Sequence, residues 1–242
     1  MNEEKIPVEL IDSFSMQNKI PVHFIEQPHD INFSYIKSSL YSQQKFETNL
    51  KRIQNKEYNF FSQTDNWFQT FIKNTDLKDK KILIISNKIL WHELFFIDEN
   101  VSQLDVFVEQ KQTSFTEKID YIDNFENKVY DYIFCLHYVE KLGFGNFSEK
   151  VHPNADFIFL KNLLKNLDDC GKLILSLPLG SDVVYYPKFR VYGNERFDKL
   201  VKDYKLVEIK EFFQNAFDNK FNRFDNIAYE PLIVLEKKEE KK

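Results

Sequence analysis

With 242 residues, of which 43% are hydrophobic and 16% aromatic, the chain can bury a sizeable core, which excludes a disordered protein and favours one large α/β domain, alone or with an appendage. Its 33 basic and 38 acidic residues give a net charge of −5, so binding to nucleic acid is not expected. No apolar run approaches the roughly 18 residues of a transmembrane span, and the amino terminus lacks the order of a signal peptide, so we expect a cytoplasmic protein.

The first 78 residues show no strong strand pattern. Pro7, Pro21 and Pro28 punctuate an extended opening, after which residues 36–55 and 66–73 have the spacing of helices with polar outer faces. We therefore expect a helical N-terminal extension over residues 1–78.

From residue 80 onward, short apolar runs alternate with helical patterns. The run at residues 81–85 is continuously apolar, which is typical of a strand buried on both faces of a sheet. The further strands are expected at residues 104–108, 118–122, 132–136, 172–177, 206–210 and 232–236. Helices are expected at residues 90–97 and 155–167.

This alternation predicts a doubly wound, mostly parallel sheet of seven strands over residues 79–237. No clear crossover helix separates the last two strands, so that pair can be antiparallel. Residues 238–242 are expected to form a disordered tail.

All five glycines of the chain lie between Gly143 and Gly193. Glycine allows positive φ angles and close approach of the backbone to a ligand. We therefore expect the functional site in this segment.

The order of the elements resembles the class I, Rossmann-like fold of S-adenosylmethionine-dependent methyltransferases, in which the seventh strand is antiparallel. Residues 80–210 further resemble DUF268, a family of methyltransferase-like proteins. The matching positions are Trp91, Glu93, Glu140, Gly143, Gly145, Phe147, Pro153, Asp156, Gly171, Pro178, Gly180, Arg190, Tyr192, Gly193 and Arg196. The chain departs from the methyltransferase pattern at residues 86–91, a turn that usually contains glycines and here has none.

The resemblance implies S-adenosylmethionine as cofactor and suggests residues that hold it. Glu109 ends the second strand, where a carboxylate can accept both ribose hydroxyls. Asp123, with Asp120 as the alternative, follows the third strand, where a polar contact to adenine is common. Ser86 and Trp91 lie in the first strand-to-helix turn, near the expected methionine moiety. The structural alternatives are an exposed acid and an ordinary polar loop.

His137 and Glu140 follow the fourth strand, at the sheet edge where ligands of doubly wound folds bind. An imidazole titrates near neutral pH, so His137 is the candidate general base, with Glu140 beside it. A metal set of His137, Glu140, His152 and Asp156 lacks tight ligand spacing, so no metal is predicted.

Asp156, Arg190, Tyr192 and Arg196 are the candidate substrate-binding residues, because two arginines near a glycine turn can grip an anionic acceptor. The structural alternatives are an arginine–Glu195 pair that fixes an ordered loop and, for Asp156, a favourable place at a helix N-terminus.

The leading functional hypothesis is a methyltransferase that acts on a small or glycan-linked acceptor, since the resembling family is associated with surface-polysaccharide gene clusters. The second is a methyltransferase-like scaffold that has lost cofactor binding, which the glycine-free turn favours. The third is an enzyme that modifies a sugar or phosphorylated substrate, which the arginines favour. A homo-oligomer is also considered.

Overall fold

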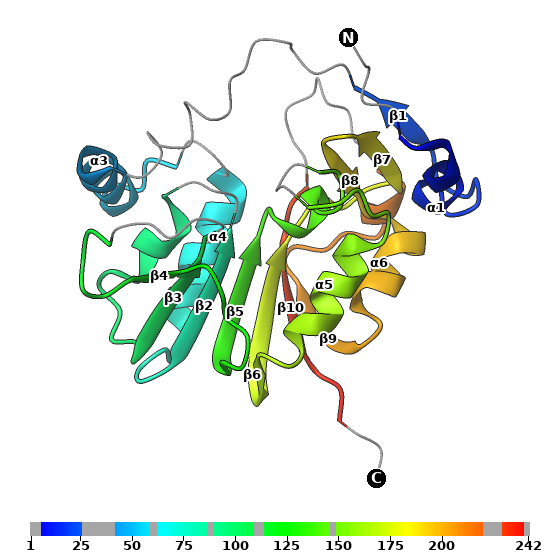
Figure 1. Cartoon of the computed structure of the whole chain (residues 1–242). Helices are drawn as coiled ribbons and strands as arrows, with labels where there is room; N and C mark the ends of the chain where they lie inside the picture. The colour runs from blue at the N-terminus through cyan, green and yellow to red at the C-terminus, as the bar shows by residue number, and fades with distance from the viewer. Residues whose placement is uncertain are drawn as a thin grey trace.

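The computed structural model describes residues 6–25, 42–58, 62–86, 90–108, 114–145, 149–219 and 229–239 (Figure 1). Its centre is a seven-stranded sheet with the strand order β4-β3-β2-β5-β6-β10-β9. The strands are β2 (Lys81–Ser86), β3 (Gln103–Phe107), β4 (Asp120–Ile122), β5 (Tyr130–Leu136), β6 (Leu167–Ser176), β9 (Tyr204–Ile209) and β10 (Leu232–Lys237). β10 is antiparallel to both of its neighbours, while the pairs from β4 to β6 are parallel. The predicted mostly parallel sheet is confirmed.

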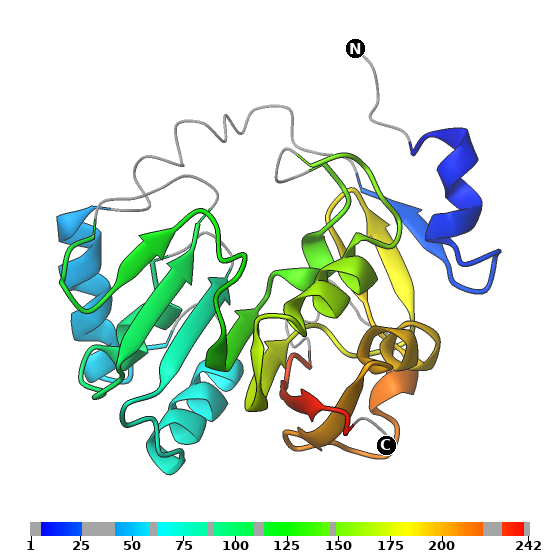
Figure 2. The ribbon, with the colours of Figure 1, turned by 60° about the horizontal axis from the view of Figure 1, so that its bottom comes forward.

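The apolar runs form strands because both faces of the sheet are covered. Along β2, Leu83 and Ile85 belong to one buried cluster and Ile82 and Ile84 to the opposite one, so successive side chains enter different cores. Helices α5 (Ala155–Leu163) and α6 (Asn194–Val201) cover the first face, and α3 (Gln43–Gln54) and α4 (Ser62–Asn74) lie on the second (Figures 1 and 2).

Helices α3 and α4 are built into the second core. Trp67, Phe68 and Ile72 of α4 are buried in the same cluster as the β2 side chains, and the Asn49 amide of α3 donates to the Leu90 carbonyl at 2.6 Å. Helix α4 begins at Ser62, earlier than the predicted residue 66. Of the other predicted helix, at residues 36–55, residues 36–41 lie outside the described residues, and Gln43–Gln54 form α3.

A second, small sheet joins the N-terminal segment to the glycine-bearing part of the chain. In it, β1 (Val22–Phe24) pairs in parallel with β7 (Val183–Tyr186), which pairs antiparallel with β8 (Phe189–Val191). It shares a core with the 3₁₀ turn η1 (Val8–Leu10) and the short helix α1 (Ile11–Phe14), and Figure 1 shows it beyond the carboxyl end of β6. The sequence pattern gave no sign of these strands of three and four residues.

Two predicted helices differ from the structure. Residues 90–97 contain the 3₁₀ helix η2 (His92–Phe96), so within the described residues no α-helix links β2 to β3. Helix α5 ends at Leu163, not at residue 167, because Leu167 already pairs with Tyr130 of β5. Leu167 fitted the helical spacing since its side chain enters the same core as Leu160.

Among the described residues, no helix combines the length and the apolar character that crossing a membrane requires.

Two glycines after β5 provide a matched test of backbone geometry. Gly143 and Gly145 have φ angles of +78° and +82°. A Cβ at Gly143 would lie 2.1 Å from the His152 carbonyl oxygen, whereas the nearest atom of the described residues to a Cβ at Gly145 would be 3.8 Å away. The two positions therefore share the left-handed strain and differ in the steric clash.

We expect Gly145→Ala to lower the free energy of unfolding by about 1–2 kcal/mol, the cost of a left-handed alanine. Gly143→Ala should cost about 1–3 kcal/mol more, because the loop must also move away from the new methyl group. Urea unfolding of both variants measures the difference, and equal losses would contradict the packing described here.

Candidate functional site

The chain changes direction at the centre of the sheet, between β2 and β5. From β2 it continues outward through β3 and β4, and from β5 it continues to the other side through β6. Ligands of doubly wound folds bind at the carboxyl ends of strands at such a switch point. Ser86 ends β2 and pairs with Leu136, the last residue of β5, so the turns after these two strands meet there.

Two histidines, one from each of these turns, pack against each other. The rings of His92 and His137 have centroids 6.0 Å apart and planes inclined by 27°. His92 begins η2 and His137 directly follows β5. His137 has a φ angle of +51°, an uncommon conformation for a residue with a side chain and one that recurs at functional sites.

Each imidazole contacts its own carboxylate. Nδ1 of His137 lies 3.1 Å from Oε2 of Glu230, just before β10, and Nε2 of His92 lies 3.4 Å from Oδ1 of Asp65 on α4. The other Asp65 oxygen accepts the Trp91 indole N–H at 2.9 Å. Burial lowers the pKa of His92, and the positive charges of His137 and Lys141 act in the same direction, while Asp65 opposes them.

Glu140 lies beside this pair, in the 3₁₀ helix η3 (Val139–Lys141). Its side chain is buried, with Oε1 at 3.2 Å from the Lys141 ammonium, which also donates to the His137 carbonyl at 2.9 Å. Glu140 Oε2 is buried with no hydrogen-bond partner among the described residues. The structure thus brings the two predicted catalytic residues, His137 and Glu140, into one turn.

Glu93 closes the turn after β2. Its carboxylate accepts the Trp91 backbone N–H at 3.0 Å and the Tyr121 hydroxyl at 3.3 Å. Burial raises the pKa of Glu93 to about 7, although these hydrogen bonds favour the charged form. The Glu93 carboxylate therefore holds the backbone at Trp91, the last residue of the glycine-free segment.

The predicted cofactor residues are distributed as follows. Trp91 is fully buried, and its indole is held by Asp65. Asp123 is exposed directly after β4, whereas its alternative Asp120 begins that strand at the opposite end. Ser86 is the last residue of β2. Glu109 lies outside the described residues.

The four predicted substrate residues form one buried network. The Asp156 carboxylate accepts the Arg196 guanidinium at 2.6 Å and the Tyr192 hydroxyl at 3.0 Å, and it lies 3.8 Å from Nε of Arg190. All four residues are fully buried. Burial alone would raise the pKa of Asp156, but the two guanidinium groups outweigh it and lower that pKa.

The arginines also bind the loop that follows β5. Arg190 donates to the carbonyls of Leu142 at 2.5 Å and Pro153 at 3.1 Å, and its guanidinium lies 4.2 Å from the Phe144 ring centroid. This arrangement favours the alternative in which arginines fix an ordered loop. The acidic partner of the arginines is Asp156 and not the expected Glu195, which forms an exposed ion pair with Lys19 at 3.5 Å.

Four residues that hold the site or its surroundings were not predicted from the sequence: Asp65, His92, Asp182 and Glu230. His92 stands between the motif residues Trp91 and Glu93, which was a usable signal. Asp182 accepts the backbone N–H groups of Gly193, Glu195 and Arg196 at 2.8–3.2 Å and so caps the N-terminus of α6. No local pattern pointed to Asp65 or Glu230, because the histidine that each contacts, His92 or His137, is far away in the chain.

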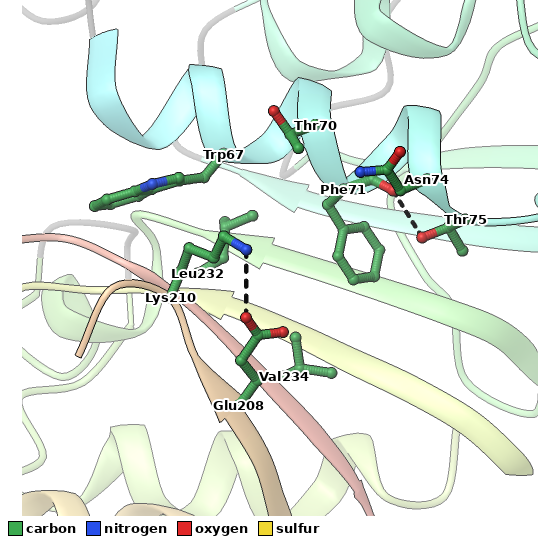
Figure 3. A pocket seen from close by; sticks show the side chains of 9 residues that line it. All are labelled: Trp67, Thr70, Phe71, Asn74, Thr75, Glu208, Lys210, Leu232 and Val234. Atoms are coloured by element: carbon green, nitrogen blue, oxygen red, sulfur yellow. Dashed lines mark hydrogen bonds and ion pairs between the residues drawn. The ribbon is translucent and has the colours of Figure 1, made fainter.

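A shallow groove of about 150 Å³ lies between α4 and the strands β9 and β10 (Figure 3). Trp67, Phe71, Leu232 and Val234 supply apolar walls, and Glu208 and Lys210 form an ion pair at its edge. None of the predicted site residues lines this groove. In the part of the chain that the structure describes, no three histidine, cysteine or acidic side chains are grouped to hold a metal ion.

The buried network predicts a large effect for one isosteric change. Asp156→Asn leaves two buried guanidinium groups without their carboxylate, so the free energy of unfolding should fall by about 3–5 kcal/mol. Asp169→Asn is the control, since Asp169 forms an exposed ion pair with Lys237 and should change stability by less than about 0.5 kcal/mol. Urea unfolding of both variants measures this, and equally small effects would contradict an anchoring role.

The raised pKa of Glu93 predicts a pH-dependent stability. The ordinary pKa of this carboxyl is 4.5 and the folded value is about 7. The native state therefore holds the proton more tightly than the unfolded state, so the stability of the protein falls as the pH rises between these two values.

Glu93→Gln removes this titration. Relative to the natural protein, the variant should gain about 2–3 kcal/mol in unfolding free energy between about pH 5 and pH 8. The exposed Glu117→Gln serves as control, and urea unfolding at both pH values measures the gain. A constant difference across this pH range would show that Glu93 does not titrate there.

Two methyltransferases are among the solved structures that are similar to the chain. One is the 1,6-didemethyltoxoflavin-N1-methyltransferase of Burkholderia thailandensis with bound 1,6-didemethyltoxoflavin and S-adenosylhomocysteine, at 10% identity and a TM-score of 0.54, covering 89% of this chain and 94% of that chain. The other is the N-methyltransferase NodS of Bradyrhizobium japonicum in complex with S-adenosylhomocysteine, at 13% identity and a TM-score of 0.50, covering 81% of this chain and 98% of that chain. At these identities the likeness concerns the fold.

No curated protein sequence matches the chain. A family model described as "Caenorhabditis protein of unknown function, DUF268" matches residues 80–224, which is more than half of the 242 residues. The chain therefore belongs to the DUF268 family, and its fold is that of the class I S-adenosylmethionine-dependent methyltransferases.

Proposed function

We propose that the chain is an S-adenosylmethionine-dependent methyltransferase that acts on a small or glycan-linked acceptor. The observation that carries the proposal is the His137–Glu230 pair at the carboxyl end of β5, beside the end of β2. A carboxylate-bound imidazole at a switch point is a general base in the place where this fold binds its ligands.

The order of three polar residues along the chain fits the chemistry of the cofactor. β2, β3 and β4 are neighbouring parallel strands, and Ser86, Glu109 and Asp123 each end or follow one of them. In this proposal Glu109 accepts the ribose hydroxyls, Asp123 contacts adenine, and Ser86 and Trp91 border the methionine moiety. The exposed carboxylate of Asp123 is accessible to a ligand.

The base is oriented before any substrate arrives. Glu230 faces Nδ1 of His137 at 3.1 Å, which favours the tautomer with the proton on Nδ1 and the lone pair on Nε2. Nε2 is itself buried, so the acceptor must first reach it; it then takes the proton of the acceptor hydroxyl or amine, and Glu230 stabilises the resulting imidazolium. Glu140 supplies a second, partly unpartnered carboxylate next to this turn. General-base assistance of this kind contributes about 10²–10⁴ in rate.

When bound, S-adenosylmethionine supplies a methyl group whose bond to sulfur breaks with the electron pair left on sulfur, while the lone pair of the acceptor forms the new bond. The remaining work of the protein is to align the acceptor with that methyl group. A small acceptor agrees with the relative crystallised with 1,6-didemethyltoxoflavin. A glycan-linked acceptor and a role in surface-polysaccharide synthesis rest on the family resemblance.

A specific observation favours the second candidate, a methyltransferase-like scaffold without cofactor. In the turn after β2 the backbone N–H of Trp91 is already bound by Glu93, and the indole of Trp91 fills the core. The third candidate, a sugar- or phosphate-modifying enzyme, depended on arginines that are buried against Asp156 and backbone carbonyls.

Titration with S-adenosylhomocysteine separates the two remaining candidates. A methyltransferase should be stabilised saturably against thermal unfolding, by about 2.7 kcal/mol at a hundred times the dissociation constant. Glu109→Ala should abolish this gain, whereas Glu117→Ala, an exposed control, should retain it. Absence of any shift at millimolar ligand would refute cofactor binding and leave the scaffold as the function.

A further inference from the structure

The second imidazole of the site, that of His92, has no part in the function proposed above. It is buried, with 2% of its surface exposed, and so is its partner His137, with 1% exposed. The two rings come from different turns and stack at 6.0 Å. Asp65 holds His92 from helix α4, while Glu230 holds His137 from the segment before β10.

We propose that Asp65 and His92 are positioning residues for His137: they form a second carboxylate–imidazole pair that keeps one neutral ring against the base and strengthens its hold on a proton. This inference rests on the proposed function, because it concerns the same base. It adds a route by which a carboxylate on α4 acts on His137 without touching it.

The charges around the two rings allow only one of the two imidazoles to be positively charged at a time. Asp65 from α4 and His137 and Lys141 from the β5 turn act on His92. His137 faces Glu230 and the His92 ring, and Lys141 binds its carbonyl. A second positive charge at about 6 Å would weaken proton binding by on the order of a hundredfold at an effective dielectric constant of 20. His92, whose pKa is lowered by burial, is the ring that stays neutral.

A neutral His92 can still transmit the charge of Asp65. Nε2 of His92 lies 3.4 Å from Oδ1 of Asp65, and the negative charge of this buried carboxylate polarises the ring and makes its face more electron-rich. An electron-rich face attracts a cation stacked on it, here the imidazolium of His137. Asp65 therefore favours the protonated state of His137 through His92, and His92 neither gains nor loses a proton.

The test is a double-mutant cycle read by NMR on the whole protein without ligand. The pH titration of the His137 ring signal, assigned with His137→Gln, is recorded for the natural protein, Asp65→Asn, His92→Gln and the double variant. Asp65→Asn should reduce the proton affinity of His137 about three- to tenfold, and clearly less in the His92→Gln background. Asp76→Asn, an exposed aspartate just after α4, is the matched control and should leave the curve in place.

Asp65→Asn can change the proton affinity of His137 equally with and without His92, or in neither case. Either result would overturn the inference, since Asp65 would then act on His137 directly or not at all. If Asp65→Asn fails to fold, the signal of His92 in the natural protein decides: an imidazole that takes up its own proton while His137 is charged refutes the pair.

Failure of the proposed function is distinguished from failure of this inference by ligand binding. If S-adenosylhomocysteine binds and the cycle is additive, only the inference falls; if the cycle is non-additive and the ligand does not bind, the pair exists without a methyltransferase role.

Discussion

The pairing of β2 with β5 is the constraint on which the rest of the structure depends. Both strands are buried on their two faces, so the chain must supply helices to each side: α3 and α4 from before the sheet, α5 and α6 from within it. From β2 the chain continues toward one side of the sheet and from β5 toward the other, and the residues that follow both strands lie at one edge. The contact between His92 and His137 is a direct consequence.

On the other side of that edge, a buried charge cluster holds the neighbouring segments together. Asp156 of α5 joins Arg190 of β8 and Arg196 of α6, and the arginines bind carbonyls of the loop that carries Gly143. Such a cluster is costly to bury and is stable only when its members are paired. It links the small sheet to the loop after β5, the segment that begins with His137 and Glu140.

The position of a site residue could be predicted where that residue directly follows a strand. It could not be predicted where the residue contacts the site from a distant part of the chain. His137 and Glu140 follow a clear apolar run, so their place at the sheet edge could be read from the sequence. Asp65 and Glu230 contact the two histidines across separations of 27 and 93 residues, and no local pattern encodes such a contact. Arg190 and Arg196 were expected at a ligand, yet their burial follows from packing against Phe144 and Phe157.

The sequence by itself determined the order and type of the main strands, because short continuous apolar runs between turn residues are typical of strands in a sheet that is covered on both faces. It also located part of the special backbone: Gly143 and Gly145 take up positive φ angles, but so do eight described residues that have side chains, among them His137. Tertiary structure alone decided the small sheet, the short η2 turn and the partners of each buried charge. Short strands and buried ion pairs gain their stability from segments distant in the chain, so the physical reason for them exists only once those segments meet.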